Sequence, residues 1–170
     1  NIETHKAGSQ LSGRPMFAGA MLDRVVRVVE RDKNHPCIIG WSLGNEAGTG
    51  ANHEMMAAWV KARDGSRWLH NEGAAHSKNG KQTEDYGYVD YRSRMYIVKA
   101  TMREILATDD HRPLIYCEYA HSMGNSTGHI DTFATMFREY PNFAGGFIWD
   151  WIDQGLEATN AKGQKYMAYG

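Results

Sequence analysis

The chain has 170 residues, and its 19 basic and 20 acidic side chains leave a formal charge of −1. That balance argues against a dedicated nucleic-acid binder, which carries a clear basic excess, and the 42% hydrophobic content excludes a disordered chain. The apolar runs are shorter than the ~20 residues that cross a membrane, and the first residues lack the basic start and apolar run of a signal peptide.

The first half of the chain alternates helical and strand patterns. Apolar residues at three- and four-residue spacing predict a helix over 16–31, and the apolar run 37–43 predicts a strand buried on both faces. Helical spacing returns over 51–62, and a short strand is predicted at 68–71. The Gly-, Ser- and Lys-rich stretch 73–94 is predicted to be a long loop.

The second half continues the alternation. Its predicted elements are a short strand near 93–96, a helix over 98–106, a strand over 114–119, a helix over 130–140, a strand over 145–152 and a polar end with a turn at 160–163. Strands that alternate with helices predict a parallel sheet covered by helices. The sequence contains no glycine-rich nucleotide motif.

The two cysteines, Cys37 and Cys117, lie in apolar runs and are predicted to be buried free thiols. Cys37 begins one predicted strand and Cys117 ends another, so the two are expected at opposite ends of the sheet. This predicts no disulfide, because a bridge needs Cα atoms within ~7 Å.

Polar and aromatic side chains gather where the predicted strands end. They are Asn45 and Glu46, Glu72, Glu118 and His121, and Trp149. In a β/α barrel the carboxyl ends of the strands form one rim, which builds the active site. Carboxylates on such a rim can perform acid/base steps, and aromatic rings can stack on a sugar.

Glu46 and Glu118 are the two carboxylates that stand out. A retaining glycosidase needs two carboxyl groups ~5–5.5 Å apart, one as acid/base and one as nucleophile. A salt-bridged structural glutamate is the alternative interpretation of either residue.

Glu3 and His5 form a second signal, because residues two apart on a strand point to one face. A carboxylate and an imidazole together can bind a divalent metal, although two such residues also occur without one.

Five segments then carry a family resemblance: NIETH at 1–5, RDKNHP at 31–36, WSLGNE at 41–46, CEYAHSMGNS at 117–126 and GGFIWDW at 145–151. In this order they resemble the catalytic domain of lac-type β-galactosidases, glycoside hydrolase family 2. Two positions depart from the family pattern. Lys6 stands where the family usually has Gly, and Arg94 stands where it has Pro before a Met-Tyr pair.

The resemblance implies a role for each matching residue. Glu46 corresponds to the acid/base and Glu118 to the nucleophile, while Asn45 corresponds to the contact with the sugar 2-hydroxyl. Met95 and Tyr96 resemble the family's Met-Tyr pair, whose tyrosine hydrogen-bonds the nucleophile.

The same resemblance implies further substrate contacts and a metal site. His121 and Trp149 correspond to galactose-contacting residues. Glu3, His5 and Glu46 correspond to the ligands of a Mg²⁺ ion, and such a site is expected to accept Mn²⁺ as well.

The fold implied by the resemblance is a (β/α)8 TIM barrel, of which residues 1–170 cover roughly the end of strand three to strand eight. A complete barrel needs ~250 residues, so we expect a catalytic-domain segment of a larger multidomain protein, inactive when isolated.

The implied activity is retaining hydrolysis of terminal β-D-galactosides such as lactose. The alternatives are a β-glucuronidase or β-mannosidase of the same family, or a non-catalytic carbohydrate-binding remnant. The resemblance also implies a homo-oligomer without nucleic-acid or membrane partners. A cytoplasmic location is expected, with a periplasmic or secreted protein as the alternative.

Overall fold

The computed structural model describes residues 9–75, 87–124, 126–152 and 154–169. The predicted metal ligands Glu3 and His5 lie outside these residues. In the described part, the strands are β1 (Gly40–Ser42), β2 (Trp68–His70), β3 (Arg92–Met95), β4 (Leu114–His121), β5 (Phe143–Trp149), β6 (Gly155–Thr159) and β7 (Lys165–Tyr169). β1 pairs with β2, and β3, β4 and β5 form a three-stranded sheet, with every one of these pairs parallel.

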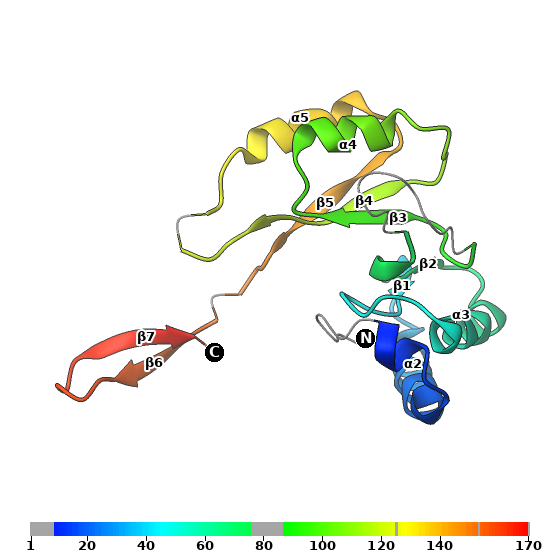
Figure 1. The fold of residues 1–170 in the computed structure, drawn as a ribbon, viewed down its shortest axis with the longest axis horizontal. Coiled ribbons are helices and arrows are strands. Elements are labelled where there is room, and N and C mark those ends of the chain that lie inside the picture. Colours follow the sequence, from blue (N-terminus) through cyan, green and yellow to red (C-terminus); the bar gives the residue numbers. More distant parts are fainter. Residues whose placement is uncertain (1–8, 76–86, 125, 153, 170) are drawn as a thin grey trace.

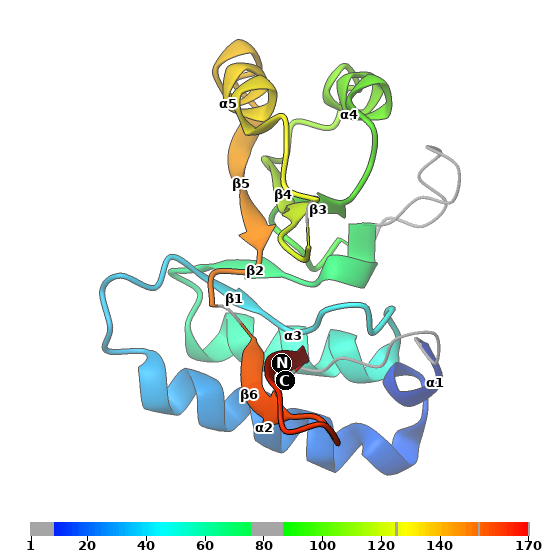
Figure 2. The same ribbon diagram turned by 90° about the vertical axis from the view of Figure 1, so that its left-hand side faces the viewer.

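Helices follow the strands in the alternation that the sequence predicts. They are α1 (Ser9–Ser12), the short 3-10 helix η1 (Pro15–Phe17), α2 (Ala18–Asp32), α3 (Ala51–Arg63), the 3-10 helix η2 (Glu72–Ala75), α4 (Lys99–Leu106) and α5 (Ile130–Glu139). Figures 1 and 2 show α4 and α5 on one side of the three-stranded sheet, with α2 and α3 packed together near β1 and β2. Among the described residues, no helix combines the length and hydropathy that a membrane span requires.

Two apolar clusters hold these layers together. On α2, Met21, Val25 and Val29 recur every four residues and pack with β1 and β2. The second cluster lies between α4, α5 and the three-stranded sheet, where the ring of Tyr116 contacts that of Phe133 edge-on at 5.5 Å between centroids. Each helix therefore buries one apolar stripe against strands, as an amphipathic helix of a β/α fold must.

Polar contacts join β2 to β3 and so bring the two sheets together. The backbone N–H of Asp90 donates to the carbonyl of Leu69 at 2.9 Å, and the Asp90 carboxylate accepts the Leu69 N–H at 2.8 Å. His70 contacts Ser42 through Nδ1 at 2.9 Å and Ser93 through Nε2 at 2.8 Å. The five parallel strands of the described residues thus follow one another in chain order, as in the wall of a β/α barrel.

Two expectations about the strands were wrong. The predicted strand at 37–43 is confined to Gly40–Ser42, and Ile39 is 72% exposed, so this strand is not buried on both faces. Cys37 is exposed as well, and Cys117 is half-buried, while both thiols are free as predicted. An apolar run shows that a segment favours burial, but it does not show which neighbours cover each face.

The polar end of the chain is more regular than its composition suggests. β6 and β7 form an antiparallel hairpin around the predicted turn, where the N–H of Gly163 donates to the carbonyl of Asn160 at 2.9 Å. Gly163 has a φ of 77°, which a glycine adopts without steric cost. Figure 1 shows this hairpin extending away from the parallel strands.

Candidate active site

Side chains from separate strand ends line one hollow of about 210 Å³. They are Asn45, Glu46, Tyr96, Glu118, His121 and Trp149. All six were predicted from the sequence as site residues, and Met95 lines an adjoining hollow beside Glu46. Glu118 lies within β4, three residues before its end, and the other residues lie at or just after the carboxyl ends of β1, β3, β4 and β5. The structure therefore brings the two candidate catalytic carboxylates to one rim.

Two kinds of contact hold Glu118: backbone pairing within β4 and a hydrogen bond from a neighbouring side chain. It lies in β4, in register with Met95 of β3, and its carbonyl accepts the N–H of Tyr96 at 3.0 Å. The Tyr96 hydroxyl donates a hydrogen bond to the carboxylate Oε2 of Glu118. Burial, this hydrogen bond and the charge of Glu118 all raise the pKa of Tyr96, so its proton stays on the phenol at neutral pH.

Glu46 is held through its main chain. It follows β1 in a turn, with a left-handed φ of 46° that few residues other than glycine adopt. Its backbone N–H donates to the carboxylate Oε2 of Glu72 at 2.9 Å. Glu72 lies at the start of η2 and is buried, with 3% of its surface exposed. Sequence reasoning placed Glu72 on the rim and gave it no role, because the positive φ of Glu46 leaves no signature in the sequence.

Aromatic rings form one wall of the hollow. His121 and Trp149 are register partners on β4 and β5, and their rings stack 4.4 Å apart at an interplanar angle of 21°. Tyr96 meets the His121 ring edge-on at 5.8 Å. Such a wall offers a flat apolar surface beside two carboxylates, which suits a ring with one apolar face and several hydroxyls.

Two groups, the half-buried Cys117 and the buried Arg94, lie close to the site in the sequence but are not among the residues that line the hollow. Burial raises the pKa of the Cys117 thiol to about 12, and its Sγ donates to the carbonyl of Arg94 at 3.2 Å. Cys117 therefore stays a neutral thiol at physiological pH, which excludes it as a nucleophile. Arg94 is buried on β3, where burial and Arg92 lower its pKa while Glu72 opposes them.

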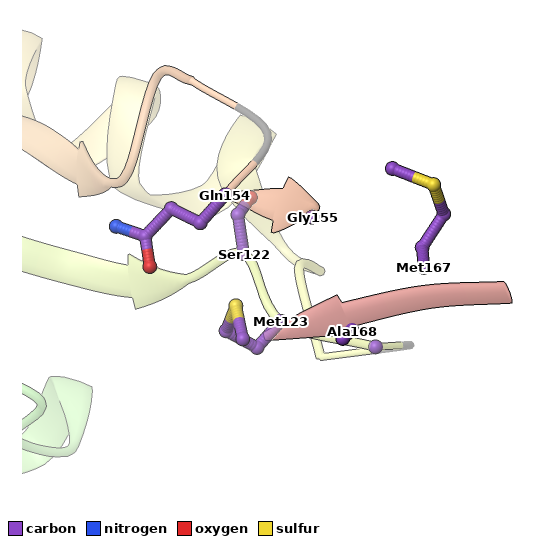
Figure 3. Close-up of a pocket in the computed structure, with 7 residues that line it drawn as sticks. Ser122, Met123, Gln154, Gly155, Met167 and Ala168 are labelled. Carbon is purple, nitrogen blue, oxygen red and sulfur yellow. The ribbon is translucent and has the colours of Figure 1, made fainter. Parts of the chain in front are cut away.

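A second hollow of about 390 Å³ lies beside the end of β4. Ser122, Met123 and Gly124 line it from one side, and Gln154, Gly155, Met167 and Ala168 line it from the hairpin (Figure 3). Because Ser122 directly follows His121, this hollow neighbours the one that holds the two glutamates.

Of the three expected metal ligands, the structure describes Glu46. In the part of the chain that the structure describes, no three or more His, Cys, Asp or Glu side chains are arranged to hold a metal ion. Glu46 lines the hollow, and its carboxylate is the kind of oxygen ligand that Mg²⁺ prefers.

Comparison with known proteins agrees with this geometry. A family model described as "Glycosyl hydrolases family 2, TIM barrel domain" matches residues 1–170. The chain belongs to glycosyl hydrolase family 2. This confirms the family resemblance seen in the sequence, and it assigns the five parallel strands of the described residues to a TIM barrel.

Within glycosyl hydrolase family 2, curated relatives named "Beta-galactosidase" align with the whole chain. Those of Pectobacterium atrosepticum and Pseudoalteromonas haloplanktis are each 46% identical, and that of Vibrio cholerae is 44% identical. The chain spans 17% of the length of each of these relatives.

A solved structure of a β-glucuronidase from an uncultured Clostridium sp. has a similar fold. It superposes with a TM-score of 0.60 at 15% identity, over 90% of this chain and 30% of the other. At that identity the similarity shows the fold alone and nothing about the substrate.

Proposed function

We propose that the whole protein hydrolyses terminal β-D-galactosides with retention of configuration. The observation that carries the proposal is the hollow in which Glu46 and Glu118, from different strand ends, lie beside the stacked rings of His121 and Trp149. The relatives named β-galactosidase, 44–46% identical over the whole chain, support the choice of sugar.

The first chemical step uses both glutamates. A carboxylate oxygen of Glu118 attacks the anomeric carbon, a bond from that oxygen to the sugar forms, and the glycosidic bond breaks. Glu46 gives its proton to the departing oxygen, so the leaving group departs as a neutral alcohol. The hydroxyl of Tyr96 donates a hydrogen bond to the carboxylate of Glu118 and thereby orients the nucleophile.

The second step reverses these roles. Water attacks the anomeric carbon of the glycosyl–enzyme ester, Glu46 takes the water proton, and Glu118 leaves as a carboxylate. Two displacements at one carbon restore the original configuration, which is the outcome that defines a retaining enzyme.

The remaining residues of the hollow are proposed to bind the sugar. Asn45 lines the hollow, and its amide would bind the 2-hydroxyl, while the stacked rings of His121 and Trp149 would form the wall against which the sugar lies. Met95, from the adjoining hollow, adds an apolar contact beside Glu46.

A magnesium ion is proposed to be held by Glu3, His5 and Glu46, with Mn²⁺ as a substitute. When bound, such an ion supplies a fixed positive charge beside a carboxylate that takes part in acid/base chemistry. The residues of this chain contribute the oxygen and nitrogen donors that hold it.

Specific observations weigh against the alternatives. A β-glucuronidase needs a cation to bind the carboxylate of its substrate, and the described residues that line the hollow include no lysine or arginine. A pure sugar-binding module needs neither a second carboxylate nor the hydrogen bond between Tyr96 and Glu118.

The test is a panel of aryl β-galactosides, β-glucuronides and β-mannosides, assayed with the protein at its full natural length. We expect the galactoside to be hydrolysed fastest, and NMR to show β-galactose as the first-formed sugar. Initial α-galactose would exclude the retaining mechanism, and preferred cleavage of another glycoside would replace the proposed substrate. Sedimentation velocity of the same sample tests the proposed homo-oligomer, and cell fractionation tests the cytoplasmic location.

A further inference from the structure

The backbone of Glu46 adopts a conformation that has to be held in place. A left-handed φ, here 46°, is unfavourable for a residue with a Cβ, because it brings the Cβ too close to the following carbonyl oxygen. Such conformations persist where the surrounding structure over-determines them, and they cluster at functional sites. The surroundings of Glu46 should therefore contain the group that fixes this turn.

Glu72 provides the fixing contact. Its carboxylate Oε2 lies 2.9 Å from the backbone nitrogen of Glu46, across 26 residues of sequence. A hydrogen bond to a carboxylate is about twice as strong as one between neutral groups. Because 3% of the surface of Glu72 is exposed, water competes little for this contact.

Backbone contacts join the same two segments. The N–H of Glu72 donates to the carbonyl of Gly44 at 3.2 Å, and the N–H of Leu43 donates to the carbonyl of His70 at 2.9 Å. A Cβ placed on Gly73 would collide with the carbonyl of Gly48, so the segments after β1 and β2 touch along their length. Glu72 is thus anchored on the same main chain that it fixes.

Arg94 accounts for the burial of an acidic side chain at this point. A buried carboxylate is unfavourable unless opposite charge and hydrogen bonds compensate it. Arg94 lies on β3, is 7% exposed, and interacts electrostatically with Glu72. The position that departs from the family's Pro thus supplies positive charge near Glu72.

We propose that Glu72 is a positioning residue, which holds the backbone of Glu46 in its left-handed turn and so directs the Glu46 carboxyl into the hollow beside Glu118. This inference rests on the proposed function for the identity of the reaction. It assigns to Glu72 the delivery of the proton donor and no contact with the substrate.

The proposal predicts a loss that depends on the leaving group. Lactose needs protonation of its departing oxygen, whereas 2,4-dinitrophenyl β-D-galactoside does not. In the protein at its full natural length, Glu72→Ala should lower kcat/KM for lactose about 100-fold, the scale of a lost general acid, and that for the dinitrophenyl substrate less than about fivefold. For the activated substrate, kcat should fall although kcat/KM stays nearly unchanged. The reason is that kcat includes hydrolysis of the glycosyl–enzyme, the second step, in which Glu46 acts as the base.

Two further variants keep the result interpretable. Glu72→Gln retains an acceptor oxygen, so it should show the same selectivity with a smaller loss, and it serves if Glu72→Ala does not fold. Glu104→Ala, an exposed glutamate on α4, is the matched control and should leave both substrates unaffected. Equal losses on both substrates in the Glu72 variants, or no loss on lactose, would overturn the proposal.

A measurement without substrate separates this inference from the proposed function. A crystal structure of the Glu72→Ala protein should show Glu46 relaxed to a negative φ, and an unchanged positive φ would overturn the inference. A wild-type protein that hydrolyses neither galactoside would instead overturn the proposed function, and the φ of Glu46 would still decide the role of Glu72.

Discussion

The two glutamates of the hollow are held in opposite ways. Glu118 lies within β4, a strand of eight residues paired on both sides, and a neighbouring side chain, Tyr96, contacts its carboxylate. Glu46 lies in a turn after β1, a strand of three residues, and a neighbouring side chain, Glu72, contacts its backbone. The sheet fixes the residue that must attack one carbon atom, while a separate carboxylate fixes the turn that carries the proton donor.

Because of this difference, substitutions near the two glutamates should act in different ways. Substitutions near Glu118 should act on the orientation and charge of its carboxylate, because β4 pairs with β3 at Glu118 itself and with β5 at Tyr116 and Ala120 on either side of it. Substitutions near Glu46 should act on the shape of the turn, which depends on a small number of long-range contacts.

Removal of the nucleophile should have the largest effect. Glu118→Gln keeps the shape of the side chain but supplies no carboxylate to attack the sugar, so kcat should fall on the order of 10⁵-fold or more. Stopped and continuous assays with an aryl galactoside measure this. Retention of more than about one thousandth of the wild-type kcat would contradict the assignment, because the loss of a single positioned donor already costs about 10²–10³-fold.

Glu46→Gln should lose less activity than Glu118→Gln, and its loss should depend on the leaving group of the substrate. We expect a loss of about 10²–10⁴-fold on lactose, the usual contribution of a general acid or base. An activated leaving group or added azide should restore part of the rate, because the first needs no proton and the second needs no base. An equal response of the Glu118 and Glu46 variants to azide would show that the two roles are assigned wrongly.

Tyr96→Phe removes the hydroxyl that contacts Glu118, so it should lower kcat by acting on the nucleophile and not on the proton donor. Loss of one positioned donor at a reacting group costs about 10²–10³-fold in kcat. The loss should be equal for poor and activated leaving groups, since it acts on the nucleophile. A loss confined to poor leaving groups would connect Tyr96 to the Glu46 side instead.

Metal removal should act on the Glu46 side alone. EDTA is expected to lower kcat/KM about tenfold, with Mg²⁺ restoring it, because the positive charge that the ion would supply beside the acid/base carboxylate is then lost. Calorimetry should also show that the Glu46→Gln protein, which lacks one of the proposed carboxylate ligands, binds Mg²⁺ more weakly than the Glu118→Gln protein. Unchanged kinetics in metal-free buffer would remove the metal from the mechanism.

The last prediction concerns stability, not activity, and a buried histidine on α3. His53 on α3 is fully buried, and burial lowers its pKa from 6.5 to about 4. Within the described residues its two ring nitrogens have no hydrogen-bond partner. The unfolded chain therefore binds a proton that the folded chain rejects between these pH values, and stability should fall as the pH drops from 6.5 toward 4, by at most about 1.4 kcal/mol per pH unit.

The midpoint of thermal unfolding, followed from pH 7.5 to 4.5, measures this dependence. His53→Leu should flatten the profile, and His111→Leu, at an exposed position, should not. A His53→Leu profile as steep as that of the wild type would assign the acid sensitivity to other groups.

The sequence predicted much of this arrangement, and the physical reasons for its failures are local. Short apolar runs located the strand that precedes Glu46 and the strands that carry Glu118 and Trp149, because a strand packed under helices needs apolar side chains. The exposure of Cys37 and Ile39 was missed, since an apolar run does not record which neighbours cover it. The contact between Glu72 and Glu46 was missed as well, because it depends on a backbone angle that no residue preference encodes.

The β6–β7 hairpin is a third case. Its strands carry exposed apolar side chains such as Leu156 and Met167 among polar ones. Sequence reasoning found the turn between them from Asn160 and Gly163, and it left the flanking residues without structure. Short strands that pair only with each other give too weak a period to separate from a loop.

The close approach of Gly73 to Gly48 has a consequence for engineering and for evolution. A side chain at position 73 would collide with the neighbouring main chain, so the segments after β1 and β2 can change only together. Libraries that aim at new leaving-group preferences should therefore leave both segments intact. Diversity belongs in Ser122–Gly124 and the facing hairpin strands, where a hollow of about 390 Å³ leaves room for larger side chains.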